Sequence, residues 1–295
     1  MENKRYAVKV FYLGYRYYGF QRQPDVPTVE GEIIKTLKSL KMMSEEPRYT
    51  AASRTDRGAH AIGQTIAFNA TRELDLTEIN EKLPSDIIFW AYSLAPNDFN
   101  ARKKALYRHY KYIAENPGID LDKVNEALKH IIGVHNFKNL CYKASRSTIR
   151  RIYLAKASLI DSNYIEFDFY GASFARGLIR KTVTACLKVG LGEMSLSEFK
   201  QLLNPTYAYA RGIRPAPPEG LFLVDAFYPI AFTIDAISAE KVEKALTNEI
   251  SRENLSRKVA EIMLAEFRKL REEIEEQAQE ISRWTFSSSL RRLSH

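Results

Sequence analysis

Long runs of strand-forming residues dominate the first 230 positions and most narrowly limit the fold. Each run is rich in Val, Ile, Phe or Tyr and is bounded by turn-forming residues. The runs span 6–13, 48–54, 63–70, 87–95, 105–115, 149–160, 163–171 and 221–228. Few helical patterns separate them, which favours an α+β fold. We expect two similar subdomains that share a continuous, mainly antiparallel sheet, with a basic cleft between them.

Helical segments are fewer. One is expected to begin at Thr28, where apolar residues start to recur at three- and four-residue steps. A second is expected over 174–189, ending at Gly190 as a C-cap, and a third begins with the capping box Ser195 to Glu198. The resulting domain prediction is an N-terminal subdomain, a C-terminal subdomain and a helical extension, over 1–104, 105–230 and 231–295.

The extension, residues 231–295, has its own helical pattern. Apolar residues recur between charged ones at Met263, Phe267, Leu270, Ile274 and Ile281. An amphipathic helix packed on its own domain is the favoured interpretation. A dimerising helix is the alternative, because the pattern lasts too few heptads to identify a coiled coil.

Charge is divided unevenly along the chain. The sequence has 44 Lys and Arg and 36 Asp and Glu, a net charge of +8. The extension holds 11 basic and 12 acidic residues, so residues 1–230 carry a net +9. Such an excess favours a polyanionic partner, above all nucleic acid, although many mildly basic proteins bind none.

Several classes of protein are disfavoured by missing motifs. The sequence has no G-x-x-x-x-G-K-[ST] phosphate loop, no H-E-x-x-H motif and no Cys/His cluster. Its two cysteines cannot form a disulfide framework, and neither a signal peptide nor an apolar run of membrane length is visible. We therefore expect a soluble, cytoplasmic protein that needs no metal and no cofactor.

One predicted turn concentrates charge. The stretch AASRTDRGAHA, residues 51–61, sets Asp56 between Arg54 and Arg57. A structural turn explains the Asp and the Gly, but it does not need the two arginines. The segment SRTDRGAHAIGQ resembles the G-R-T-D-x-G-V-H-A-x-G-Q signature of TruA-type tRNA pseudouridine synthases.

Five further segments resemble the same family, in its order and spacing, over about the first 230 residues. YRYYGFQRQ is similar to the loop Y-x-G-W-Q-R-Q, with Phe20 in place of Trp. The others are FNARKKALYRHYKYI (99–113), GVHNFKNLC (133–141), SFARGLIRKTV (173–183) and APPEGLFLVDAFYP (216–229). Ser53 stands where bacterial members have Gly, and the 231–295 extension lies outside the resemblance.

The resemblance implies roles for individual residues. Asp56 would be the reactive carboxylate, Arg180 would orient it and keep it ionised, and Tyr110 would stack on the base. Arg54 would fill the gap left by a flipped uridine. Further RNA contacts are expected from Gln21, Arg22, Arg57, Arg108, Lys111 and Arg176. From the residues alone, an ordinary core Tyr110 and a solvated helix face carrying Arg176 and Arg180 remain alternatives. His60 is interpreted as a hydrogen-bonded turn residue.

The implied activity is isomerisation of uridine to pseudouridine at tRNA positions 38, 39 and 40. Asp56 could form an ester at C1′ or remove a proton from C2′, and the sequence fits both routes. The alternatives are a synthase acting on other tRNA uridines and a non-catalytic RNA-binding protein or RNA chaperone. An RNA hydrolase would need an acidic metal cluster. A homodimer is left open.

Overall fold

A ten-stranded sheet runs through the computed structural model, which describes residues 4–142, 147–209, 212–251 and 255–293. In the first half of the chain lie β1 (Lys4–Tyr12), β2 (Thr50–Ala51), β3 (His60–Ala70) and β4 (Ile87–Leu94). Then come β5 (Tyr107–Glu115), β6 (Gly133–Asn136), β7 (Ile149–Leu159), β8 (Tyr164–Gly171), β9 (Leu221–Phe227) and β10 (Thr233–Ile234). The strand order is β10–β4–β1–β3–β9–β5–β8–β7–β6, and β2 pairs with β3.

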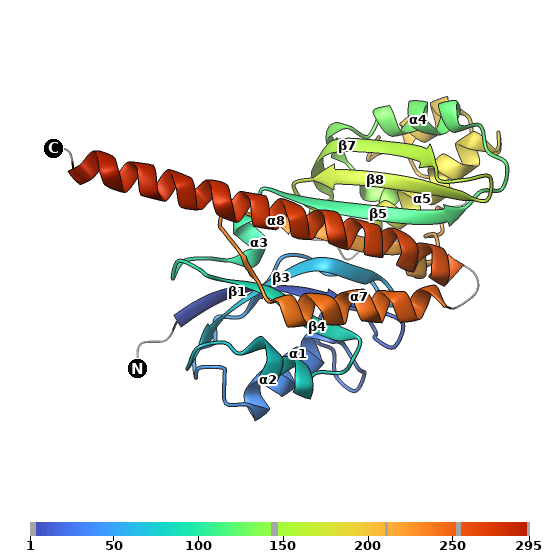
Figure 1. Ribbon diagram of the computed structural model, residues 1–295. Coiled ribbons are helices and arrows are strands. Elements are labelled where there is room, and N and C mark those ends of the chain that lie inside the picture. The colour runs from blue at the N-terminus through green and yellow to red at the C-terminus, as the bar shows by residue number, and fades with distance from the viewer. Residues whose placement is uncertain (1–3, 143–146, 210–211, 252–254, 294–295) are drawn as a thin grey trace.

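The sheet has two halves joined at one seam (Figure 1). Strand β9 pairs in parallel with β3 and antiparallel with β5, and so connects the halves, while every other pair of described strands is antiparallel. The expected α+β fold on a continuous, mainly antiparallel sheet is therefore confirmed. The domain boundaries near 104 and 230 stay a prediction.

Five helices cover one face of the sheet, here called the front face. They are α1 (Val29–Ser39), α2 (Leu76–Lys82), α4 (Leu121–Lys129), α5 (Leu178–Gly190) and α6 (Leu196–Gln201). Strand periodicity explains the division of the core: along β1, Val8 and Val10 belong to this front layer, whereas Ala7 and Phe11 belong to the layer behind the sheet. A short helix, α3 (Ala101–Lys104), precedes β5.

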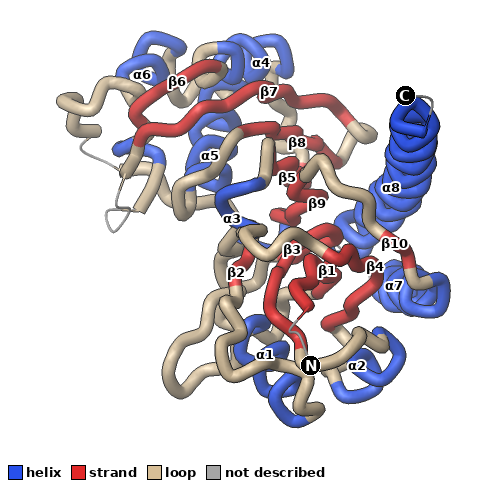
Figure 2. Tube along the Cα trace, turned by 90° about the vertical axis from the view of Figure 1, so that its left-hand side faces the viewer, coloured by secondary structure: helices blue, strands red, loops and turns tan. Residues whose placement is uncertain are grey.

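The back face is covered in part by α7 (Ala236–Ile250) and α8 (Leu255–Leu293). Figure 2 shows both helices on the side of the sheet away from α5. Met263 and Phe267 of α8 are fully buried, and the ring of Phe267 lies 5.1 Å from that of Trp90 in β4. The prediction of an amphipathic helix packed on its own domain is thus confirmed. None of the helices in the described part of the chain has the length and apolar character to cross a membrane.

Some local predictions need correction. The helix expected over 174–189 begins only at Leu178, because Gly177 adopts a left-handed conformation with φ of 78°. Gly190 is its last residue rather than its cap. The run 48–54 forms only the two residues of β2. The capping box at Ser195 and Glu198 is confirmed.

Candidate active site

A tight turn between β2 and β3 presents Asp56 at the seam of the sheet. The Ala59 amide donates to the Asp56 carbonyl at 3.2 Å, and Gly58 supplies the required positive φ of 82°. The Thr55 hydroxyl lies 2.8 Å from the buried hydroxyl of Tyr12. These bonds fix the backbone on both sides of the carboxylate.

The backbone just before this turn is held by one side chain instead of by strand pairing. Gln64 of β3, which is fully buried, accepts from the Ser53 amide at 3.1 Å and donates to the Ser53 carbonyl at 2.7 Å. One amide side chain thus bonds both backbone groups of Ser53, as a neighbouring strand would. The Ser53 side chain is not used in this contact and lines the site.

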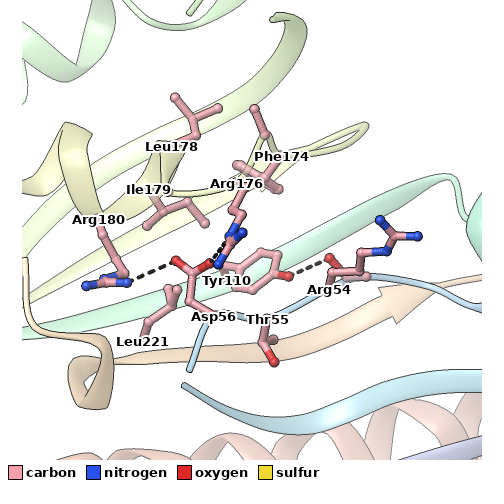
Figure 3. A pocket seen from close by; sticks show the side chains of 13 residues that line it. Arg54, Thr55, Asp56, Tyr110, Phe174, Arg176, Leu178, Ile179, Arg180 and Leu221 are labelled. Carbon is pink, nitrogen blue, oxygen red and sulfur yellow. Dashed lines mark hydrogen bonds and ion pairs between the residues drawn. The ribbon is translucent and has the colours of Figure 1, made fainter. Parts of the chain in front are cut away.

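Asp56 is paired with an arginine from the other half of the sheet (Figure 3). Arg180, in the first turn of α5, donates from Nη1 to Asp56 Oδ2 at 3.0 Å and from Nε to the Ala216 carbonyl at 2.6 Å. The side chains of Asp56 and Arg180 are 10% and 11% exposed. A largely buried, doubly anchored guanidinium fixes the direction of the carboxylate.

A second arginine faces the other carboxylate oxygen. Nε of Arg176 lies 3.6 Å from Asp56 Oδ1, and the Arg176 side chain is 71% exposed. Arg176 precedes Gly177 and therefore lies before α5, so it does not share a helix face with Arg180. Asp56 thus has one fixed and one solvent-exposed cation.

Tyr110 of β5 forms the wall of the site beside the carboxylate. Its phenol oxygen lies 2.6 Å from the Ser53 hydroxyl, and its ring contacts Phe174 edge to face, with ring centres 5.2 Å apart. Burial raises the pKa of Tyr110 to about 12, although the bond to Ser53 and the charge of Arg108 act in the opposite direction. Tyr110 is therefore a neutral phenol at physiological pH.

Together these groups line one small pocket. Its walls come from the turn at 53–56, from β5, from the segment 174–180 and from Leu221 of β9. The pocket presents one oriented carboxylate, that of Asp56, beside the ring of Tyr110 and the guanidinium groups of Arg176 and Arg180. Among the described residues, no group of three or more His, Cys, Asp or Glu could hold a metal ion.

Comparison with known proteins identifies the group to which this chain belongs. A family model described as tRNA pseudouridine synthase matches residues 127–229. The tRNA pseudouridine synthase A of Methanosarcina mazei is 39% identical over 230 residues, covering 76% of this chain and 84% of the relative. The chain belongs to the tRNA pseudouridine synthase A family. It is accordingly an isomerase that forms pseudouridine in tRNA.

Two further comparisons describe the reach of the similarity. The tRNA pseudouridine synthase A of Methanothrix thermoacetophila is 36% identical over 267 residues, covering 89% of this chain and 98% of the relative. This alignment covers more of the chain than residues 1–230 make up, so it includes part of the 231–295 extension. We had expected the extension to lie outside the similarity. A solved archaeal box H/ACA sRNP complex is 13% identical over 74% of this chain and 48% of that chain, with a TM-score of 0.34.

Four residues expected to contact tRNA lie at the surface of the synthase. Arg54 is exposed, and its guanidinium points away from Asp56 (Figure 3). Arg57 is exposed and stacks over the Tyr18 ring at 4.1 Å. Gln21 and Arg22 are exposed, and Nε of Arg22 lies 3.8 Å from Oε2 of Glu30. Their positions leave their roles in RNA binding as predictions.

The expectation for Arg108 is wrong in this structure. Arg108 is 4% exposed and donates to the backbone carbonyls of Ala52, Arg102 and Ala172. With its donors used on the chain itself, it cannot reach an RNA phosphate. It instead attaches the segment before the Asp56 turn to β5.

Lys111 also differs from our expectation. Strand alternation places it on the face opposite Tyr110. Its Nζ lies 2.7 Å from Glu166 of β8 and 3.0 Å from Glu266 of α8, and its side chain is 9% exposed. Lys111 is therefore a buried link between the sheet and α8, not an RNA contact.

His60 is a structural residue, as we interpreted it. Its Nδ1 accepts from the Gly14 amide at 2.9 Å, so Nε2 carries the proton and donates to the Glu219 carbonyl at 3.2 Å. Burial lowers the pKa of His60 to about 4, partly offset by the Glu219 bond. The sequence did not indicate Ser53 as a support of the site, because its partner Tyr110 lies 57 residues away.

Proposed function

We propose that this synthase isomerises the uridines at positions 38, 39 and 40 of tRNA with Asp56 as the reacting group. The observation that carries this proposal is the ion pair between Asp56 and Arg180 across the seam of the sheet, beside Tyr110. The target positions follow from the resemblance of the six sequence segments to the TruA-type family.

The reaction needs one carboxylate in two stages. Cleavage of the N1–C1′ bond leaves its electron pair on uracil N1, while Asp56 either forms an ester at C1′ or removes the C2′ proton. After the base has turned, C5 bonds to C1′ as the ester opens or the proton returns to C2′. C5 then loses its proton and N1 gains one. The substrate is only rearranged, so no cofactor is consumed.

Other residues would handle the RNA. The uridine must leave its stack to reach Asp56, and the ring of Tyr110 offers a face for its base. Arg54 would occupy the vacated space, and Arg57, Gln21, Arg22 and Arg176 would contact the backbone. We further propose that the enzyme works in the cytoplasm, where its tRNA substrate is found. A homodimer that grips one tRNA is compatible with this scheme.

Asp56→Asn tests the role of the carboxylate. The amide keeps the shape of the side chain but cannot act as nucleophile or base, so pseudouridine formation should be abolished under single-turnover conditions. tRNA affinity should stay within a few-fold of wild type. Product formed at a rate comparable to that of wild type would remove Asp56 from the mechanism.

Mapping pseudouridine in unmodified tRNA transcripts tests the positions. Product confined to 38, 39 and 40 supports the proposal, and product at other uridines assigns the enzyme a different target. A wild-type protein that binds tRNA without modifying any uridine would instead favour the non-catalytic alternative.

A further inference from the structure

An aromatic ring flanked by two cations lies next to the catalytic pocket. Tyr142 follows the short 3-10 helix η1 (Lys138–Leu140), and its amide donates to the Arg176 carbonyl at 3.0 Å. The guanidinium of Arg176 lies 5.4 Å from the centre of the Tyr142 ring, and Nζ of Lys181 lies 5.5 Å from it. The two charges are therefore held on one aromatic support.

The local backbone is built to admit this ring. A side chain at Gly177 would place its Cβ 2.8 Å from Tyr142 Cε2, and Gly177 also has a positive φ. Only glycine satisfies both conditions without strain. The arrangement of Tyr142, Arg176 and Lys181, here called the outer subsite, is thus a formed feature rather than two loose surface charges.

The cations of the outer subsite are poorly neutralised. Lys181 donates to the Cys141 carbonyl at 3.2 Å and has no carboxylate partner among the described residues. Partial burial lowers the pKa of Lys181, because its charge has lost water without gaining an anion. Among the described carboxylates Arg176 contacts only that of Asp56, at Oδ1 and in an exposed position, whereas Arg180 is buried and has two anchors.

Arg176 is one of the cations that line the catalytic pocket, and it faces Oδ1 of Asp56. A substrate atom that contacts Oδ1 would have to displace this side chain. Arg176 is the lining cation that is both close to Asp56 and largely in solvent. Arg180 cannot move without breaking its bond to the Ala216 carbonyl.

We propose that the outer subsite binds a phosphodiester of the RNA backbone next to the target uridine, and that Arg176 leaves Asp56 to do so. Phosphate offers guanidinium a two-pronged contact and offers Lys181 a counter-charge. As Arg176 turns, Oδ1 of Asp56 is uncovered toward the ribose, while Oδ2 stays on Arg180. Entry of the substrate and exposure of the reacting oxygen are then one event. This inference rests on the proposed role of Asp56.

The first test is the salt dependence of tRNA binding. Arg176→Gln and Lys181→Gln should each reduce the slope of log affinity against log salt by about 0.7 to 0.9, the value for one lost phosphate contact. Lys188→Gln, on the same helix as Lys181 but paired with Glu193, is the matched control and should keep the wild-type slope. Wild-type slopes in both subsite variants would overturn the proposal.

The second test asks whether Asp56 and RNA compete for Arg176. Asp56→Asn should tighten tRNA binding about two- to fivefold, because it releases Arg176 from an exposed ion pair. That gain should vanish when Arg176→Gln is added. A gain that persists in the double variant, or no gain at all, would overturn the exchange.

These binding measurements do not depend on activity. If wild-type enzyme forms no pseudouridine, yet the slopes and the double variant behave as expected, the proposed function fails and the subsite stands. If the wild type is active and the subsite variants bind with unchanged slopes, the subsite fails and the function stands.

Discussion

The hydroxyl of Ser53 lies 2.6 Å from the phenol oxygen of Tyr110 and joins the Asp56 turn to β5. The two residues come from opposite halves of the sheet. Because Gln64 fixes the Ser53 backbone through two bonds, the Ser53 hydroxyl is a rigid reference point for the ring that faces Asp56.

Ser53→Ala should therefore lower the rate at saturating tRNA up to about tenfold, with little change in KM, the loss expected for one hydrogen bond. Ser53→Thr retains the hydroxyl and should recover most of the rate. Tyr110→Phe removes the other partner, so the double variant should be no slower than either single one. Additive losses would show that the two hydroxyls act independently.

Arg180 should matter for the chemical step far more than Arg176. Arg180→Ala removes the buried, doubly anchored cation that orients Asp56, whereas Arg176→Ala removes an exposed one. At saturating tRNA we expect the two variants to differ by at least about 2 kcal/mol in activation free energy, the range for removing one preorganised charge. Arg180→Lys should restore activity only in part, because an ammonium cannot reproduce both bonds.

Single-turnover rates measured side by side check this expectation, with thermal unfolding as the control for folding. If Arg180→Ala and Arg176→Ala slowed the reaction equally little, the functional pairing of Arg180 with Asp56 would be contradicted. Arg180 would then act as an ordinary solvated basic residue.

Lys111 should contribute to stability and not to RNA binding. Lys111→Met leaves the carboxylates of Glu166 and Glu266 close together without their shared cation. We expect the free energy of unfolding in urea to fall by about 3 kcal/mol. tRNA affinity and its salt slope should not change. Arg57→Gln is the matched comparison, and it should weaken tRNA binding without loss of stability. Reduced affinity in a folded Lys111→Met protein would contradict the structure.

Lys111 also shows what could not be predicted from the sequence, namely which face of a strand is buried. The chain pattern predicted the strand, and alternation within it places Tyr110 and Lys111 on opposite faces. Which face is covered depends on α8, more than 100 residues later in the chain. Without that partner, Lys111 looks like any basic residue beside an aromatic strand. Arg108 is likewise buried by contacts distant in sequence, those with the carbonyls of Ala52 and Ala172.

The core of the candidate site was more predictable. Asp56 lies in a compact motif, and Arg180 and Tyr110 lie in segments with the order and spacing of the family. Such local signals can be read without knowledge of the packing. The long-range contacts that support the site could not be predicted, because nothing in the sequence near Ser53 indicates Tyr110. The spacing of Arg176 from Arg180 suggested a shared helix, but Arg176 precedes that helix.

His60 should make the stability of the synthase sensitive to acid. Its folded-state pKa of about 4 lies below the ordinary value near 6.5, chiefly because burial disfavours the charged ring. Below pH 6.5 the unfolded chain binds a proton that the folded protein does not, so stability falls as the pH drops from about 6.5 toward 4. At pH 5 this loss should reach about 2 kcal/mol relative to pH 7.

Urea unfolding at pH 7 and pH 5 isolates this contribution when wild type is compared with His60→Gln. Other titrating groups act in both proteins and cancel, so the variant should lose about 2 kcal/mol less than wild type between these pH values. Parallel curves for wild type and His60→Gln would mean that the folded protein accepts the proton at His60. In that case Nδ1 could not keep its bond from Gly14, and the loop that supports the Asp56 turn would have to rearrange in acid.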